Sequence, residues 1–109
     1  MLQPMMREGG AETLTVQTTL NSHTCNATKD GKTIVISVYG LVPSTITAGT
    51  PFVTVKDVNL KQSVTALGKN SSDLLIMNAA NSGSDIKISC GSHNLSSNYV
   101  TSQIVGILN

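Results

Sequence analysis

The 109-residue chain has no tryptophan, and only 3% of its residues are aromatic. Charged residues are also scarce, at 12%, which is about half of the share usual in soluble domains. Seven Lys and Arg side chains stand against six Asp and Glu, so the formal net charge is +1. Because there is no basic surplus to attract phosphates, nucleic acid is not an expected partner.

Long apolar runs are missing as well. Residues 1–10 contain no apolar stretch long enough for a signal peptide, and nowhere do roughly 18 apolar residues follow one another as in a membrane span. We therefore expect no membrane contact. An extracellular location would be reached through particle assembly in a host cytoplasm followed by cell lysis, which fits a virion component.

Cysteine is limited to Cys25 and Cys90, which lie far apart in the sequence. This spacing matches neither a redox motif nor the four ligands of a structural zinc site, so no metal is expected. A disulfide between them would close a loop of about 65 residues and contribute around 4 kcal/mol. The alternative is that each cysteine is a small buried apolar residue, and the sequence leaves this open.

Apolar and polar residues alternate along most of the chain, with a period of two that predicts half-buried strands. The richest segment in β-branched residues, 33–39, is expected to be a central strand, and 84–90 shows the clearest alternation. No window has helical periodicity, although residues 74–77 allow a helical turn as well as the strand that we predict. The predicted strands are 13–17, 22–28, 33–39, 52–58, 62–67, 73–78, 84–90 and 98–108.

Turn residues separate these eight short strands. The sequence Lys-Asp-Gly-Lys at 29–32 predicts a tight hairpin with Asp30 and Gly31 as its central residues, and Asn-Ser-Gly at 81–83 predicts another turn. Strands at this spacing predict an all-β fold, an antiparallel β-sandwich of jelly-roll-like form, as one domain over residues 11–109. Residues 1–10, interrupted by Pro4 and ended by two glycines, are expected to form a flexible or docking arm.

Catalytic patterns are weak. His23 and His93 lie far apart in polar segments, and the aspartates lie near strand ends, where carboxylates commonly cap turns. There is neither a Gly-x-Ser-x-Gly nucleophile motif nor a glycine-rich phosphate loop. We therefore predict that the protein is not an enzyme and uses no cofactor, unless the fold places a histidine beside an aspartate in a cleft.

Ligand binding is better supported, because Ser, Thr and Asn supply the neutral hydrogen-bonding groups that sugars need, although exposed strands carry the same residues. Only Phe52, Tyr39 and Tyr99 could offer an aromatic platform, and both tyrosines are more typical of the edge of a core with the hydroxyl in water. Polar loops beside strand ends are the expected contact regions. The candidate ligand-binding residues are Asn70, Ser71, Ser72, Asp73, Ser92, His93, Asn94 and Asn98.

A longer pattern adds a family resemblance. In residues 20–40 a short strand, the Lys-Asp-Gly-Lys turn and a β-rich strand follow one another, and residues 44–55 continue with a polar segment, an Ala-Gly-Thr turn and another strand. Residues 86–88 after an Asn-Ser-Gly turn and the closing strand at 99–102 complete it. The pattern, over about residues 13–108, resembles the C-terminal β-sandwich domains of bacteriophage tail fibres and baseplate receptor-binding proteins.

The resemblance implies a virion protein that attaches to a host-surface receptor, such as a bacterial glycan, by multivalent binding without catalysis. It also implies a homotrimer that buries one apolar sheet face around a threefold axis. Apart from the resemblance, we expect residues 1–10 to dock onto other virion proteins. One segment departs from the family: residues 56–61 read Lys-Asp-Val-Asn-Leu-Lys where members have a Gly-Tyr-Arg-Pro-like segment. That loop therefore offers no aromatic contact.

Two other functions remain open. A capsid decoration or head-fibre protein would use residues 1–10 as the arm that docks on the particle. An Ig-like bacterial adhesin module would have similar strands, but it would be expected to carry a signal peptide, for which we find no pattern.

Overall fold

The computed structural model describes residues 11–109, and all regular elements in this range are β-strands. The prediction of an all-β domain is confirmed, whereas the arm expected at residues 1–10 lies outside the described residues. The strands are β1 (Glu12–Leu14), β2 (Val16–Thr18), β3 (Asn26–Asp30), β4 (Thr33–Leu41), β5 (Pro51–Val55), β6 (Val64–Lys69), β7 (Leu74–Ser82), β8 (Asp85–Cys90) and β9 (Tyr99–Ile107).

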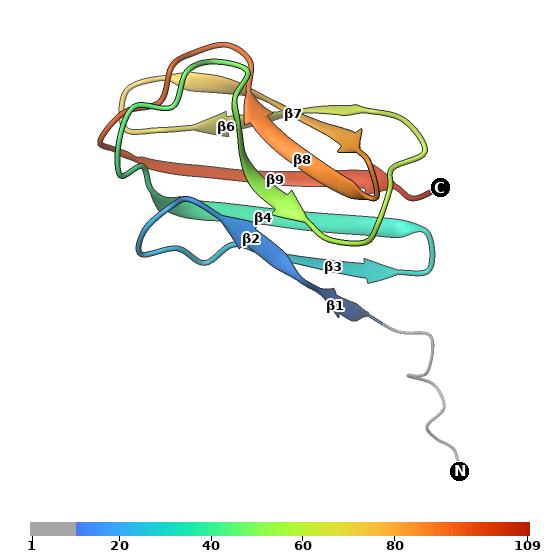
Figure 1. Ribbon diagram of the computed structural model, residues 1–109. Coiled ribbons are helices and arrows are strands. Elements are labelled where there is room, and N and C mark those ends of the chain that lie inside the picture. The colour runs from blue at the N-terminus through green and yellow to red at the C-terminus, as the bar shows by residue number, and fades with distance from the viewer. Residues whose placement is uncertain (1–10) are drawn as a thin grey trace.

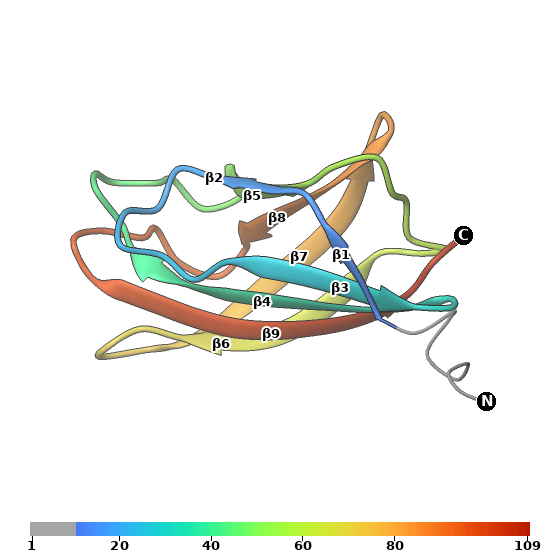
Figure 2. The ribbon, with the colours of Figure 1, turned by 90° about the horizontal axis from the view of Figure 1, so that it is seen from below.

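The strands pair antiparallel in one sheet, in the order β1-β3-β4-β9-β6-β7-β8-β5-β2. β1 and β2 lie at the two edges of this order although only Thr15 separates them in the chain. The sheet therefore nearly closes into a barrel, with β2, β5 and β8 across the interior from β3, β4 and β9 (Figure 1 and Figure 2). The strand predicted at 13–17 is thus two strands, because the chain bends from one wall to the other, and the described strands number nine rather than eight.

The predicted hairpin at residues 29–32 joins β3 and β4. Asp30 and Thr33 form its last register pair, and Gly31 has a φ of 61°, which glycine adopts without strain. Gly31 and Lys32 are therefore the central residues. The turn lies one residue later than predicted, because Asp30 stays in the ladder.

Two predicted strands each have one end displaced by three residues or more. β3 begins at Asn26 rather than at residue 22, because residues 19–25 cross the end of the barrel, where Asn21 forms an isolated bridge with Leu41. β5 ends at Val55 rather than at residue 58, because the chain turns at Asp57, whose φ is 60°. Both differences depend on contacts that are distant in sequence or on a local conformation that alternation does not encode.

β7 is longer than predicted. Residues 74–77 lie in this strand, as expected, but so do Asn81 and Ser82, which were expected in a turn. The extension follows the ladder, in which Asn81 pairs with Ile86 and Ser82 with Asp85 of β8. The Asn81 side chain adds a second anchor: its Oδ1 accepts a hydrogen bond from the Leu60 N–H at 2.7 Å, and its Nδ2 donates to the Leu60 carbonyl at 2.8 Å. The side chain thus pairs like a peptide group with the β5–β6 connection, and the turn is reduced to Gly83 and Ser84.

Alternate residues of the strands point into the barrel and form one apolar core. The inward-facing residues predicted on 33–39 and 84–90 all belong to it, as predicted. The buried apolar side chains are Leu20, Ala27, Ile34, Ile36, Val38, Val42, Phe52, Val53, Val55, Leu60, Leu75, Met77, Ala79, Ile86, Ile88, Cys90, Leu95, Val100, Ile104 and Leu108.

The junction between β6 and β9, which we call the seam, has fewer register pairs than any other junction between neighbouring strands of the sheet. Only two register pairs form it, Gly68 with Ser102 and Lys69 with Thr101. Ser102 points inward, and its hydroxyl donates to the Leu67 carbonyl at 2.8 Å, so this carbonyl has a partner where the ladder ends. A side chain at Gly68 would be crowded here, since a Cβ would lie 3.0 Å from the Thr101 carbonyl oxygen.

The two cysteines are free thiols, which answers the question that the sequence left open. Cys90 is buried in the core and Cys25 is half-buried, so both occupy positions suited to small apolar side chains. Within residues 11–109, no helix has the length and apolar character needed to cross a membrane.

Candidate functional site

Four strand connections gather at one end of the barrel, which we call the loop end (left in Figure 1). Hydrogen bonds join two of them: the backbone groups of Ile46 and Leu95 pair in both directions at 2.8 Å, and the Ala48 N–H donates to Asn94 Oδ1 at 2.8 Å. The β4–β5 and β8–β9 connections are therefore held together. The connections are residues 19–25, 42–50, 70–73 and 91–98.

Tyr39 and Tyr99 stand together on the outer face of the sheet beside the loop end. The register pairs Tyr39 with Thr101, two residues along β9 from Tyr99, so the tyrosines are diagonal neighbours on one face. Their ring centroids are 5.3 Å apart and the ring planes are inclined by only 19°. With 43% of Tyr39 and 44% of Tyr99 exposed, this pair, which we call the tyrosine platform, leaves aromatic surface open to solvent.

The backbone on both sides of the platform is held in place. The Tyr39 carbonyl accepts hydrogen bonds from the Thr24 N–H at 2.9 Å and from Cys25 Sγ at 3.6 Å. Burial raises the pKa of the Cys25 thiol, so the thiol keeps the proton that it donates. On the β9 side, the Val42 N–H donates to the Asn98 carbonyl at 3.0 Å.

A hollow of about 330 Å³, which we call the loop-end hollow, adjoins the platform. Three of the residues predicted from the sequence line it, namely Asn70, Ser71 and Asn98. Two of these come from different loops and are in contact, because Ser71 Oγ donates to Asn98 Oδ1 at 2.8 Å. The full lining is Tyr39, Lys69, Asn70, Ser71, Asn98, Tyr99, Val100 and Thr101.

The loop that carries Asn70 and Ser71 is rigid. Asn70 Oδ1 accepts from the N–H groups of Ser72 and Asp73 at 3.0 and 2.7 Å, and the Asn70 N–H donates to the Asp73 carbonyl at 3.1 Å. Such an Asx turn fixes the direction in which the neighbouring side chains project. Ser72 and Asp73, also predicted as ligand contacts, belong to this turn but do not line the loop-end hollow.

The other predicted contacts lie elsewhere at the loop end and have structural partners. Ser92 Oγ accepts from the Ile76 N–H at 2.9 Å and lies 2.8 Å from His93 Nδ1, while Asn94 accepts from Ala48. These bonds hold the β8–β9 connection against β7 and the β4–β5 connection. The structure therefore brings Asn70, Ser71 and Asn98 to one hollow and leaves Ser92, His93 and Asn94 outside its lining.

A second hollow of about 500 Å³, the outer-face groove, continues from the platform across the outer face. Its floor is built from outward side chains in register. One row is Tyr39, Thr101, Lys69 and Leu74 on β4, β9, β6 and β7, and the next row contains Asn26, Ser37 and Gln103 on β3, β4 and β9.

Lys69, Thr101 and Gln103 were not among the residues predicted to contact a ligand, and the tyrosines were expected at the edge of the core. Alternation already places Tyr39 on the face opposite Ile36 and Val38, so its outward direction could have been found. That Tyr99 lies beside it could not, because β4 and β9 are separated by most of the chain. The same holds for Lys69, which reaches this row only through the seam.

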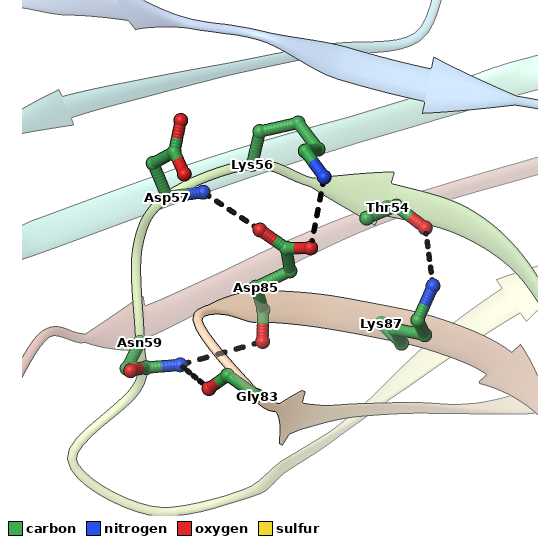
Figure 3. Close-up of polar contacts among 7 residues, drawn as sticks. All are labelled: Thr54, Lys56, Asp57, Asn59, Gly83, Asp85 and Lys87. Atoms are coloured by element: carbon green, nitrogen blue, oxygen red, sulfur yellow. Dashed lines mark hydrogen bonds and ion pairs between the residues drawn. The ribbon is translucent and has the colours of Figure 1, made fainter.

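A polar cluster at the opposite end of the barrel is structural in character (Figure 3). The Asp85 carboxylate accepts from the Asp57 N–H at 2.9 Å and from Lys56 Nζ at 3.0 Å. These two hydrogen bonds lower the pKa of Asp85. The amide of Asn59 donates to the carbonyls of Gly83 and Asp85 at 3.2 and 3.4 Å. Each of these bonds joins residues 56–59, which follow β5, to the start of β8 or the turn before it. We therefore assign this cluster a role in stabilising the fold.

Reactive groupings are few in the part of the chain that the structure describes. Over residues 11–109, no three His, Cys, Asp or Glu side chains lie close enough to hold a metal ion. His93 contacts Ser92, and His23 Nδ1 accepts from the Cys25 N–H at 3.4 Å. The groups available at the loop end are therefore aromatic rings, neutral hydrogen-bonding side chains, the ammonium group of Lys69 and the carboxylate of Asp73.

Comparison with known proteins adds no assignment. No protein-family model matches this chain, and a search of curated proteins finds no detectable relative.

Proposed function

We propose that this protein is an adhesion module of a bacteriophage virion, of tail-fibre or baseplate type, that binds a bacterial surface glycan without catalysing a reaction. The observation that carries the proposal is the tyrosine platform, stacked, exposed and bordered by Asn70, Ser71 and Asn98. A sugar ring has an apolar C–H face and a rim of hydroxyls. The aromatic surface fits the first, and neutral amides and hydroxyls fit the second.

The hydrogen-bonding groups around the platform are oriented for this task. Asn70 Oδ1 and Asn98 Oδ1 are both engaged as acceptors within the loop end. Their Nδ2 groups make no hydrogen bond to any residue in 11–109, so they are available as donors to a ligand. Because the acceptors are fixed by protein contacts, little side-chain entropy is lost when a ligand binds.

The positions of the chain ends favour an attachment role. Lys29 forms an ion pair with Glu12 at 3.6 Å, and the Leu108 N–H donates to the Lys32 carbonyl at 2.7 Å. The start of β1 and the C-terminus therefore both lie beside the β3–β4 turn, opposite the loop end. In the proposed arrangement, residues 1–10 dock on other virion proteins, while the loop end faces the bacterial surface.

The proposal includes a homotrimer that packs through the outer face of β9 at the end opposite the platform. Val105 and Ile107 are 55% and 52% exposed there, and with Val64 they line a hollow of about 420 Å³. Burial of such side chains between subunits is favourable. We interpret the nearly closed sheet as the jelly-roll-like β-sandwich of tail-fibre domains, with the two-pair seam and the β1–β2 bend joining its layers.

A capsid decoration or head-fibre protein is the second candidate. The same exposed pair, Val105 and Ile107, favours it, because a decoration protein needs a dry apolar contact with the particle surface. The two candidates differ in what covers this patch, a second and third copy of the chain or a capsid protein.

Glycan binding can be tested with the full chain on an array of bacterial surface saccharides. We expect specific binding that Tyr39→Ala and Tyr99→Ala each weaken by about tenfold or more, because truncating a central aromatic contact commonly has an effect of this size. Tyr39→Phe and Tyr99→Phe are the matched controls, since they retain the rings, and they should bind within about threefold of the original chain.

Circular dichroism of each variant separates lost contacts from lost folding. Binding to no saccharide, or equal binding by folded Ala variants, would contradict the proposed function.

A further inference from the structure

The loop-end hollow and the outer-face groove are parts of one surface. Three residues line both, namely Tyr39, Lys69 and Thr101. They come from β4, β6 and β9 and occupy one row of the register. A ligand that stacks beside Tyr39 in the loop-end hollow can therefore continue past Lys69 into the outer-face groove without leaving the protein surface.

Lys69 is the charged residue of this surface. All other residues that line the two hollows are neutral, and neither lining contains a carboxylate. Among the described residues, the ion pairs are Lys29 with Glu12 and Lys56 with Asp85, so Lys69 has no acidic partner. The ammonium group thus lines two subsites and forms no ion pair within residues 11–109, the nearest carboxylate along the chain being that of Asp73 in the β6–β7 turn.

Building on the proposed function, we infer that the ligand is an acidic oligosaccharide of at least two sugar units, with a carboxylate held at Lys69 between the two subsites. One sugar unit stacks at the tyrosine platform in the loop-end hollow. The next lies in the outer-face groove, where Asn26, Ser37 and Gln103 supply neutral donors and acceptors.

The chemistry of the lining favours this class over a neutral saccharide. A neutral sugar would use the amides and hydroxyls equally well and could accept a hydrogen bond from the ammonium group, but it would bring no opposite charge to it. A carboxylate at Lys69 adds a charge-assisted hydrogen bond, which is stronger than a neutral one. Because the site is open to water, the gain is modest and depends on salt.

The test is isothermal titration calorimetry, in which acidic oligosaccharides are titrated into the full chain. The probes are oligomers of galacturonate, mannuronate and a glucuronate-containing disaccharide repeat, each as monomer, dimer and tetramer, together with their neutral carboxyl-reduced forms. We expect at least one acidic dimer or tetramer to bind more tightly than its monomer and about fivefold more tightly than its reduced form at low salt. This preference should shrink as the salt concentration rises.

Lys69→Gln should remove the preference for the acidic form and leave binding of the reduced form unchanged, while Lys69→Arg should retain it. Lys87→Gln is the matched control, because Lys87 alternates with the buried Ile86 and Ile88 on β8 and lines neither these two hollows nor that of Val105 and Ile107.

The two proposals fail in different ways. Equal binding of acidic and reduced oligomers, unaffected by Lys69→Gln but lost in Tyr99→Ala, overturns this inference and leaves glycan binding intact. Binding of no acidic oligomer also overturns it, and the saccharide array then decides the proposed function independently.

Discussion

At the scale of single residues, Asp85 shows how one side chain can fix a corner of the fold. Its carboxylate accepts from the backbone of Asp57, which sits at a φ of 60°, and from the ammonium group of Lys56 (Figure 3). A non-glycine residue in this left-handed region is strained, so a hydrogen bond that holds it there matters. The side chain of Asp85 is only 15% exposed, which limits the water that could replace these bonds.

This arrangement predicts a pH-dependent stability. The hydrogen bond from Asp57, followed by that from Lys56, lowers the pKa of Asp85 in the folded state. A carboxylate with a lowered folded pKa stabilises the protein at pH values above its unfolded pKa, and the stabilisation is lost as the pH falls through the folded pKa. We therefore expect the urea midpoint of the original chain to exceed that of Asp85→Asn at pH 7, and the difference to shrink below about pH 4.

Asp30→Asn, at the end of β3, is the control for the general effect of removing a carboxylate. Urea unfolding of all three proteins between pH 7 and pH 2.5 measures the difference. If the gap between the original chain and Asp85→Asn is the same at both ends of this range, the contacts of the Asp85 carboxylate do not stabilise the corner.

At the scale of elements, the seam between β6 and β9 is where the sheet is completed. β4 and β9 share nine register pairs, whereas β6 and β9 share two. The seam is also where the row that contains Lys69 is aligned with Tyr39, so closure of the barrel and assembly of the candidate site depend on the same contacts.

Because the strands lie close together at the seam, we expect that adding one methyl group at Gly68 destabilises the fold. In Gly68→Ala the new Cβ would lie 2.9 Å from Met77 Cγ, 3.0 Å from the Thr101 carbonyl oxygen and 3.1 Å from Ser102 Cβ. Since the carbonyl belongs to the backbone of the neighbouring strand, relief requires the strands to separate. We expect a loss of about 1–3 kcal/mol in the free energy of unfolding, measured with urea.

Thr65→Ala is the matched control, because Thr65 is an exposed residue of the same strand. It should change the free energy of unfolding by no more than about 0.5 kcal/mol. A Gly68→Ala variant as stable as this control would show that the seam tolerates a side chain.

Some features of the strands could be predicted from the sequence and others could not. The alternation of Ile34, Ile36 and Val38 against polar neighbours is local, so strand type, inward face and the β3–β4 hairpin could be predicted. The split of 13–17 at Thr15 could not, because it depends on β1 and β2 pairing with β3 and β5 on opposite walls. Likewise, the side chain of Asn81 pairs with the backbone of Leu60, 21 residues away, which a local pattern does not reveal.

The candidate site also contains residues that could be predicted from the sequence and residues that could not. Polar loops beside strand ends are visible in the sequence, and Asn70, Ser71 and Asn98 were found by that rule. The tyrosines and Lys69 come together through β4–β9 and β6–β9 pairing, which a single sequence does not reveal. Ser92 and Asn94 satisfy the same rule, yet they bond to backbone groups of other elements.

At the scale of the whole molecule, the two ends of the barrel differ in chemistry. The loop end carries the aromatic and amide groups, and the opposite end carries the start of β1, the C-terminus and the exposed Val105 and Ile107. A trimer formed at the latter end would present three platforms in one direction. Three weak sites on one rigid body gain avidity through their effective concentration, without any new contact.

Light scattering on a size-exclusion column tests this assembly. We expect a mass near three times the 11.4 kDa of the chain, independent of concentration. Ile107→Lys should yield a folded monomer, since it would bring three like charges together in an apolar contact, whereas Gln17→Lys, with the same charge on exposed β2, should remain trimeric. A monomeric original chain would remove the threefold contact and favour a capsid surface as the partner of Val105 and Ile107. A trimeric Ile107→Lys would place the subunit contact elsewhere on the barrel.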